Sequence, residues 1–103
     1  MKISHERTHD SDLFRAVMML KDEEECRAFF EDICALTELR AIEQRFEVAK
    51  MLYHQHVYTE IMEQTNASSA TVSRVRRMLY SGKCIEELLK RMDEEDARKD
   101  LDV

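Results

Sequence analysis

The amino-acid sequence predicts an all-α protein. The chain of 103 residues contains no proline and only one glycine, so almost nothing interrupts helix formation. The turn signals and β-branched alternation that strands need are missing, and apolar residues recur instead at the three- and four-residue spacing of helices. We expect a single all-helical domain over residues 11–93, between a mobile N-terminal arm (residues 1–10) and an acidic tail (residues 94–103).

The first two helices are predicted from apolar spacing and one capping signal. Residues 11–21 place apolar side chains along one helical face. Asp22, followed three residues later by Glu25, resembles a capping box and marks the start of a second helix. This second helix repeats apolar residues at the spacing of a buried stripe, formed by Cys26, Phe29, Phe30, Ile33 and Cys34.

The longest helix is predicted over residues 37–55, with Thr37 as its N-cap. Its apolar surface is wider than one stripe and comprises Leu39, Ala41, Ile42, Phe46, Val48, Ala49, Met51 and Leu52. Such a surface indicates burial on two sides, and a chain this small can hardly supply both sides itself. We therefore expect a homodimer, and an ordinary monomeric helical core is the alternative.

Residues 59–80 are typical of two short helices joined by a tight polar turn, that is, a helix-turn-helix. Thr59 is a candidate N-cap of the first helix, and Ser68 is a candidate N-cap of the second. Asn66 tolerates the left-handed conformation that such a turn requires. Ala67 is small enough to let the two helices approach closely. Ser81 and Gly82 then stop the second helix, with the glycine at the C′ position, and a last helix follows from residue 83.

The second short helix separates its apolar residues from its polar ones. Val72, Val75 and Leu79 share one face and can pack back onto the first helix. Small polar residues near its N-terminus would let the backbone approach base edges in a major groove, and the arginines further along would reach phosphates. The candidate DNA-binding residues are Thr59, Ser68, Ser69, Ala70, Thr71, Ser73, Arg74, Arg76, Arg77 and Tyr80.

The distribution of charge supports a local DNA-binding surface on an acidic chain. The net charge is −6 overall. Residues 57–83 nevertheless hold four Lys and Arg against two Asp and Glu, which makes them the only positive stretch, at +2. The acidic remainder should discourage indiscriminate binding to nucleic acid.

Other classes of function find little support in the sequence. Cys26, Cys34 and Cys84 form no metal or redox motif, and no catalytic set or phosphate loop is present, so we expect no enzyme, no metal and no cofactor. No apolar run approaches membrane-spanning length, and residues 1–10 are too charged for a secretory signal. A cytoplasmic location without a membrane partner is expected.

Residues 32–82 resemble the Trp-repressor-like family, and more closely its YerC/YecD-type branch. The specific matches are QRFEVAKML in the long helix and ATVSR in the second short helix. The resemblance implies an intertwined homodimer in which the first three helices and the last one interlock with the partner. Two helix-turn-helix units would then project as DNA-reading heads, as in a sequence-specific transcriptional regulator, most simply a repressor.

The resemblance also implies a site for L-tryptophan, stacked between two arginines that match Arg45 and Arg74. Two positions depart from the family pattern. Val75 stands where a glycine makes room for the ligand, and Met78 replaces a serine near the ligand's amino group. Both changes fill this space, so another small effector, or repression without an effector, is at least an equal expectation. The alternative function from another class is a helical protein–protein interaction module without direct DNA readout.

Overall fold

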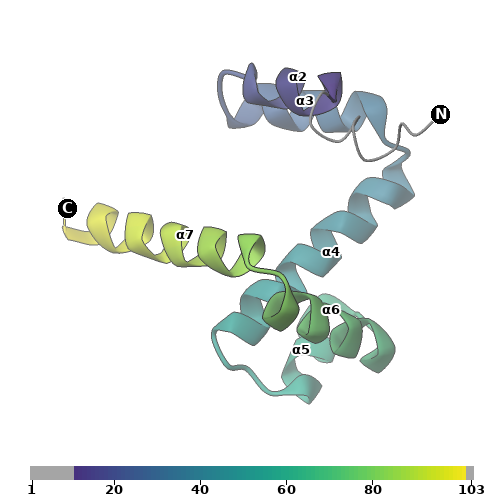
Figure 1. Cartoon of the computed structure of the whole chain (residues 1–103). Helices are drawn as coiled ribbons and strands as arrows, with labels where there is room; N and C mark the ends of the chain where they lie inside the picture. Colours follow the sequence, from purple (N-terminus) through teal and green to yellow (C-terminus); the bar gives the residue numbers. More distant parts are fainter. Residues whose placement is uncertain (1–10, 102–103) are drawn as a thin grey trace. The chain divides into compact units, whose positions relative to one another are not determined.

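The computed structural model describes residues 11–101. Within these residues all regular structure is helical, in the order shown in Figure 1, so the prediction of an all-α fold is confirmed. The expected N-terminal arm, residues 1–10, and the last two residues of the expected tail lie outside the described part. Contacts divide the chain into two units, Met1–Leu39 and Arg40–Val103.

The first unit contains α2 (Asp12–Met18), α3 (Glu23–Ile33) and the first residues of α4 (Leu36–Tyr53). The capping signal at the start of α3 is confirmed, because the Asp22 carboxylate accepts a hydrogen bond from the Glu25 backbone N–H at 2.9 Å. The Glu25 carboxylate in turn accepts from the backbone N–H of Lys21, also at 2.9 Å. The reciprocal bond thus reaches one residue further back than in the usual capping box.

The apolar stripe of α3 is not buried, contrary to our expectation. Neither α2 nor α3 contains a buried residue. Phe29 and Phe30 pack edge to face with ring centroids 5.2 Å apart, but Ile33 remains 58% exposed. Two short helices enclose too little volume to bury an apolar stripe between them. The unit therefore presents a large apolar surface.

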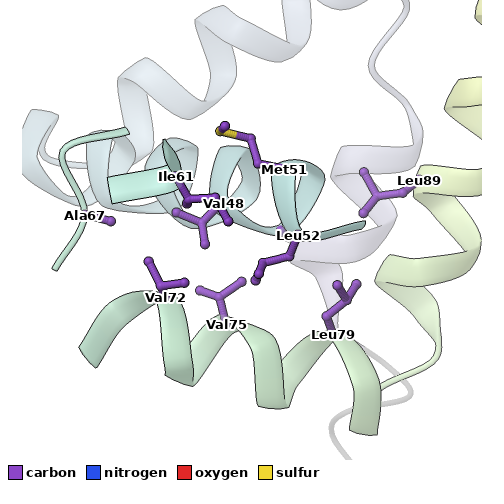
Figure 2. Packing of buried hydrophobic residues seen from close by; sticks show 10 residues of the cluster. Val48, Met51, Leu52, Ile61, Ala67, Val72, Val75, Leu79 and Leu89 are labelled. Atoms are coloured by element: carbon purple, nitrogen blue, oxygen red, sulfur yellow. The ribbon is translucent and has the colours of Figure 1, made fainter. Parts of the chain in front are cut away.

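The second unit contains the rest of α4, α5 (Tyr58–Thr65), α6 (Ser69–Ser81) and α7 (Cys84–Leu101). Figure 2 shows the apolar side chains of α6 pointing toward those of α4 and α5. The buried core of this unit consists of Val48, Ala49, Met51, Leu52, Ile61, Ala67, Val72, Val75, Leu79 and Leu89. The predicted packing of α6 onto Ile61 is therefore confirmed.

We had expected Thr37 to be the N-cap of the long helix. Helix α4 instead begins at Leu36, so Thr37 lies inside the helix. The Glu38 carboxylate instead accepts a hydrogen bond from the Ala35 backbone N–H at 2.7 Å, just before the helix. The apolar surface of α4 is only partly covered. Its C-terminal half supplies core residues, whereas Leu36 and Ile42 remain exposed.

Helix α7 continues through Leu101, so it includes most of the segment 94–103 that we expected to form an acidic tail after the helical domain. Leu89 is its one buried residue, and the His54 Nε2 atom of the α4–α5 connection lies 3.0 Å from both carboxylate oxygens of Asp93. Gly82 follows α6 as predicted, but it is the C-cap and not the C′ residue, and it is extended (φ −90°), whereas a C′ glycine is usually left-handed. A Cβ atom there would lie 3.1 Å from the Met78 carbonyl oxygen, so close approach is the reason that a glycine suits this position. In the described part of the chain, no helix has the length and apolarity needed to cross a membrane.

Candidate nucleic-acid interface

The turn between α5 and α6 is held in one conformation by side-chain hydrogen bonds. Asn66 adopts the predicted left-handed conformation (φ 63°), and its backbone N–H donates to the Met62 carbonyl at 2.9 Å. The Thr65 hydroxyl donates to the Ile61 carbonyl at 2.7 Å and accepts from the Ala67 N–H at 3.2 Å. These bonds satisfy backbone groups that the end of α5 would otherwise leave without partners.

Helix α4 also fixes this turn. The Gln44 side-chain amide donates to the Thr65 carbonyl at 3.1 Å, which joins two segments 21 residues apart in the sequence. Ala67 is only 5% exposed, so the small side chain at the crossing of the helices is buried, as expected. The angle at which α6 leaves the turn is therefore set by both α4 and α5.

The start of α6 is capped by Ser68, as the sequence predicted. Its hydroxyl oxygen accepts from the Thr71 backbone N–H at 3.1 Å and donates to the Thr71 hydroxyl, also at 3.1 Å. The two hydroxyls therefore contact each other. In this structure the Ser68 hydroxyl caps the N-terminus of α6, and a contact with DNA would be an additional role.

Most of the candidate DNA-binding residues lie at the surface. Thr71 and Ser73 are half-buried, whereas the other candidates are exposed: Thr59, Ser68, Ser69, Ala70, Arg74, Arg76, Arg77 and Tyr80. The helical period places Ala70 and Arg74 opposite the buried side of α6. Ser69, Ser73, Arg76 and Tyr80 share one flank. The structure therefore brings these α6 residues onto one continuous exposed surface.

Thr59 is not the N-cap of α5, contrary to our expectation. The helix begins at Tyr58, and Val57 occupies the N-cap position without a side-chain hydrogen bond. Thr59 is therefore the second helical residue and remains exposed. A valine cannot be recognised as an N-cap from sequence, because it has no side-chain acceptor.

The three arginines of α6 form no ion pairs with other residues of the described chain. Within the described residues, none of the ion pairs involves Arg74, Arg76 or Arg77. Arg76 lies with its guanidinium carbon 5.7 Å from the centroid of the Tyr80 ring, within the range of a cation–π interaction. An aromatic ring orients a guanidinium without neutralising it, so the surface stays cationic.

Tyr58 is a residue of this surface that the sequence analysis missed. It lines a cavity of about 300 Å³ together with Ser73, Arg76, Arg77 and Tyr80. No motif indicates it, because a residue at the start of α5 comes close to the C-terminal half of α6 only through the tight turn.

The two candidate effector residues are both exposed, Arg45 on α4 and Arg74 on α6. Glu47, one turn of α4 away from Lys50, pairs with that lysine at 2.9 Å, and Arg45 joins no ion pair among the described residues.

The two positions that depart from the family pattern have different surroundings. Val75 is 1% exposed in the core, whereas Met78 is 40% exposed. Val75 is thus a structural residue of this chain, because its side chain helps to hold α6.

The fold and the surface together define a class of small all-helical proteins in which a tight turn joins a short helix to a second short helix with exposed cationic residues. The family model described as Trp repressor protein matches residues 9–93. The chain therefore belongs to the Trp repressor family, whose members are regulators rather than enzymes.

Individual relatives agree with this assignment. The uncharacterized protein YerC of Bacillus subtilis strain 168 is 47% identical over 70 residues, which cover 68% of this chain and 67% of YerC. A TrpR-like protein from Eubacterium eligens superposes with a TM-score of 0.80 at 40% identity, covering 87% of this chain and 96% of that one. A Staphylococcus aureus protein, provisionally described as a Trp repressor, superposes with a TM-score of 0.79 at 38% identity, covering 90% and 95%.

Proposed function

We propose that this chain is a sequence-specific DNA-binding transcriptional regulator, a repressor, that acts in the cytoplasm as a homodimer through a helix-turn-helix formed by α5, the turn at Asn66 and α6. The observation that carries the proposal is that α6 is anchored by three buried residues and exposes three arginines that pair with no carboxylate among residues 11–101. A rigid, cationic, solvent-facing helix is what major-groove recognition requires.

In this proposal, the short side chains of α6 contact bases and its long side chains contact phosphates. Ser69, Ala70 and Thr71 lie in the first turn, where short side chains allow the backbone to approach base edges. Arg76 and Arg77 lie further along and reach phosphates, which supplies affinity that is independent of sequence. The short residues therefore specify the base sequence, and the arginines hold the helix in register.

The homodimer is supported by the apolar surface of the first unit. Its exposed large apolar residues are Leu13, Phe14, Met18, Met19, Ile33 and Leu36. Apolar surface of this extent on a small protein marks an interaction site. A second copy of the chain is the occupant that fits best, because a two-fold dimer reads two half-sites one helical turn apart.

The test of the DNA-binding surface is the salt dependence of binding. We expect the double variant Arg76→Ala, Arg77→Ala to bind all DNA sequences more weakly. The slope of log affinity against log salt, which is negative, should become less steep by about 2, since each lost phosphate contact removes roughly 0.9 from its magnitude. Fluorescence anisotropy with a duplex selected from a random pool measures this slope.

A matched control removes the same charge elsewhere. The double variant Arg91→Ala, Arg98→Ala removes two exposed arginines of α7 and should leave the slope unchanged. An equal change of slope in both double variants would show that net charge, and not the surface of α6, governs binding, and the assignment of phosphate contacts would then be wrong.

The second candidate function is a protein–protein interaction module, and the exposure of Met78 and Tyr80 on α6 favours it. Genomic binding measurements separate the two functions. Enrichment at discrete sites supports the regulator, whereas stoichiometric capture of a protein without DNA enrichment supports the interaction module.

A small effector, L-tryptophan or another molecule, would bind between Arg45 and Arg74. Both side chains are exposed and free of ion pairs among the described residues, so they are available to a ligand. Selection of binding sites from a random DNA pool, with and without L-tryptophan, tests this role. Identical selected sequences and affinities under both conditions would exclude L-tryptophan as the corepressor.

A further inference from the structure

A cavity of about 410 Å³, here called the corner cavity, lies where the end of α6 meets the start of α7. Its lining comes from three helices and from the connection at Gly82. Tyr53 is the last residue of α4, and Tyr80 belongs to the last turn of α6. The other lining residues are Lys83, Glu86, Glu87 and Lys90. Of this lining, Tyr80 alone is also a candidate DNA-binding residue, so the corner cavity is distinct from the proposed DNA-binding surface.

The charged residues of the corner cavity lie along one face of α7. They occupy positions i, i+3, i+4 and i+7, from the residue before the helix into its second turn. The helical period places this face opposite the exposed apolar residues Leu88 and Met92 of the same helix. A partner subunit that covers those apolar residues would therefore leave the corner cavity open.

The four charges of the lining balance one another and stay available to a ligand. Two ammonium groups and two carboxylates give the lining no net charge. Their spacing would allow ion pairs along the helix, yet within residues 11–101 no ion pair involves any of the four. A ligand with a single charge would be attracted by one pair of groups and repelled by the other. A zwitterion can place each of its charges beside an opposite one, so the lining favours a zwitterion.

Two aromatic rings add surface for a flat apolar group. Tyr53 is half-buried and packs against the hydrophobic core, and its ring centroid lies 5.5 Å from that of His54. The Tyr80 ring contacts the Arg76 guanidinium, whose carbon lies 5.7 Å from the ring centroid. A ring that is ordered in advance loses little conformational entropy when a ligand packs on it. The volume of the cavity is also within the usual range of small-molecule sites, about 300–1,000 Å³.

We propose that the corner cavity binds a small zwitterion with a planar ring, of which an aromatic amino acid is the simplest representative. Its carboxylate pairs with Lys83 or Lys90. Its ammonium group pairs with Glu86 or Glu87, and its ring packs on Tyr53. The inference goes beyond the function proposed above and does not depend on whether the chain binds DNA.

The test uses L-phenylalanine and two analogues that keep one charge each, L-phenylalaninamide and N-acetyl-L-phenylalanine, with the full chain at constant ionic strength. Gly82 is the only glycine of the chain, so its backbone amide resonance is readily assigned and reports on the cavity. We expect a saturable shift of this resonance with L-phenylalanine. Each analogue should bind roughly tenfold more weakly, the size of one lost hydrogen bond to a charged group.

Removal of one kind of charge from the cavity should invert this preference. The double variant Glu86→Gln, Glu87→Gln leaves two lysines in the lining, so N-acetyl-L-phenylalanine should bind at least as tightly as L-phenylalanine. The double variant Lys83→Gln, Lys90→Gln leaves two carboxylates and should favour L-phenylalaninamide in the same way. All four residues are exposed, so the substitutions should leave the fold intact. A merely structural role of these residues predicts no inversion, because both variants would weaken all three probes alike.

A matched control removes carboxylates of α7 outside the cavity. The double variant Glu94→Gln, Asp96→Asn should keep the wild-type order of affinities. Equal affinities of the three probes, or no saturable shift with any of them, would overturn the proposal. An order of affinities that the cavity variants leave unchanged would also overturn it, because the probes would then bind elsewhere, such as between Arg45 and Arg74. Absence of DNA binding would overturn only the function proposed above.

Discussion

Asn66 is the residue on which the turn between α5 and α6 depends. Its backbone is left-handed (φ 63°), and Gln55 is the other non-glycine residue in the described chain with a positive φ. Left-handed backbone is strained for a residue with a Cβ atom, and asparagine bears it better than most because its short polar side chain can bond locally. The left-handed backbone at this position therefore favours asparagine or glycine over other residue types.

At the residue scale, we therefore predict different effects of two substitutions at this position. Asn66→Ala should lower the free energy of unfolding by about 1 kcal/mol, the cost of the left-handed conformation for an ordinary residue. Asn66→Gly should stay within about 0.5 kcal/mol of the wild type, because glycine has no Cβ atom to strain. Urea denaturation measures both values. Gln64→Ala, an exposed neighbour inside α5, is the control, and equal stability of Asn66→Ala and the wild type would contradict the prediction.

At the scale of the helices, α6 and α7 are held in very different ways. Three residues of α6 are buried, namely Val72, Val75 and Leu79. Helix α7 is longer, yet Leu89 is its only buried residue, supported by the half-exposed pair of His54 and Asp93. An exposed ion pair contributes little to stability. The attachment of α7 within its unit therefore depends mainly on Leu89.

We accordingly predict that Leu89→Ala releases α7. The substitution should cost about 2–5 kcal/mol, since it removes a fully buried side chain and leaves a cavity. Amide hydrogen exchange should speed up along Cys84–Leu101 more than in α5 or α6. Leu88→Ala, whose side chain is 42% exposed, is the matched control and should change exchange only slightly. Equal acceleration in both variants would show that α7 has no single anchor.

At the scale of the whole molecule, the surface that remains uncovered is more informative than the core. The core lies entirely within the second unit, whereas Phe14 and Met18 of the first unit are 63% and 83% exposed. Burial of apolar surface contributes about 25 cal/mol of favourable free energy for each Å² removed from water. The exposed side chains of the first unit do not gain this free energy. A second copy of the chain, covering this surface, would recover that free energy.

We predict that Phe14→Asp dissociates the proposed homodimer. A carboxylate in an apolar interface carries a large desolvation cost, so sedimentation velocity should show monomers where the wild type shows dimers. The wild-type melting temperature should rise with protein concentration, as expected for coupled folding and association, and that of the variant should not. Arg27→Glu, a charge change on exposed α3, is the control. A wild-type chain that sediments as a monomer at all concentrations would contradict the proposal.

Much of the local structure could be predicted from the sequence because the signals are local. The Asp22 and Ser68 caps, the left-handed Asn66 and the phase of Val72 each depend on residues within one or two turns. The same reasoning failed where a residue acted outside its usual pattern. Val57 occupies an N-cap position without a capping side chain, and Gly82 is extended and not left-handed.

The sequence by itself determined that this chain is helical, where its short helices turn and which face of α6 is apolar, since backbone propensity and helical spacing are properties of neighbouring residues. Only the tertiary structure decided that Gln44 holds the turn, that Tyr58 shares a cavity with Arg76 and that the stripe of α3 stays uncovered. These facts depend on side chains that are distant along the chain and close in space. Their proximity is decided by the packing of whole helices, which no short stretch of sequence encodes.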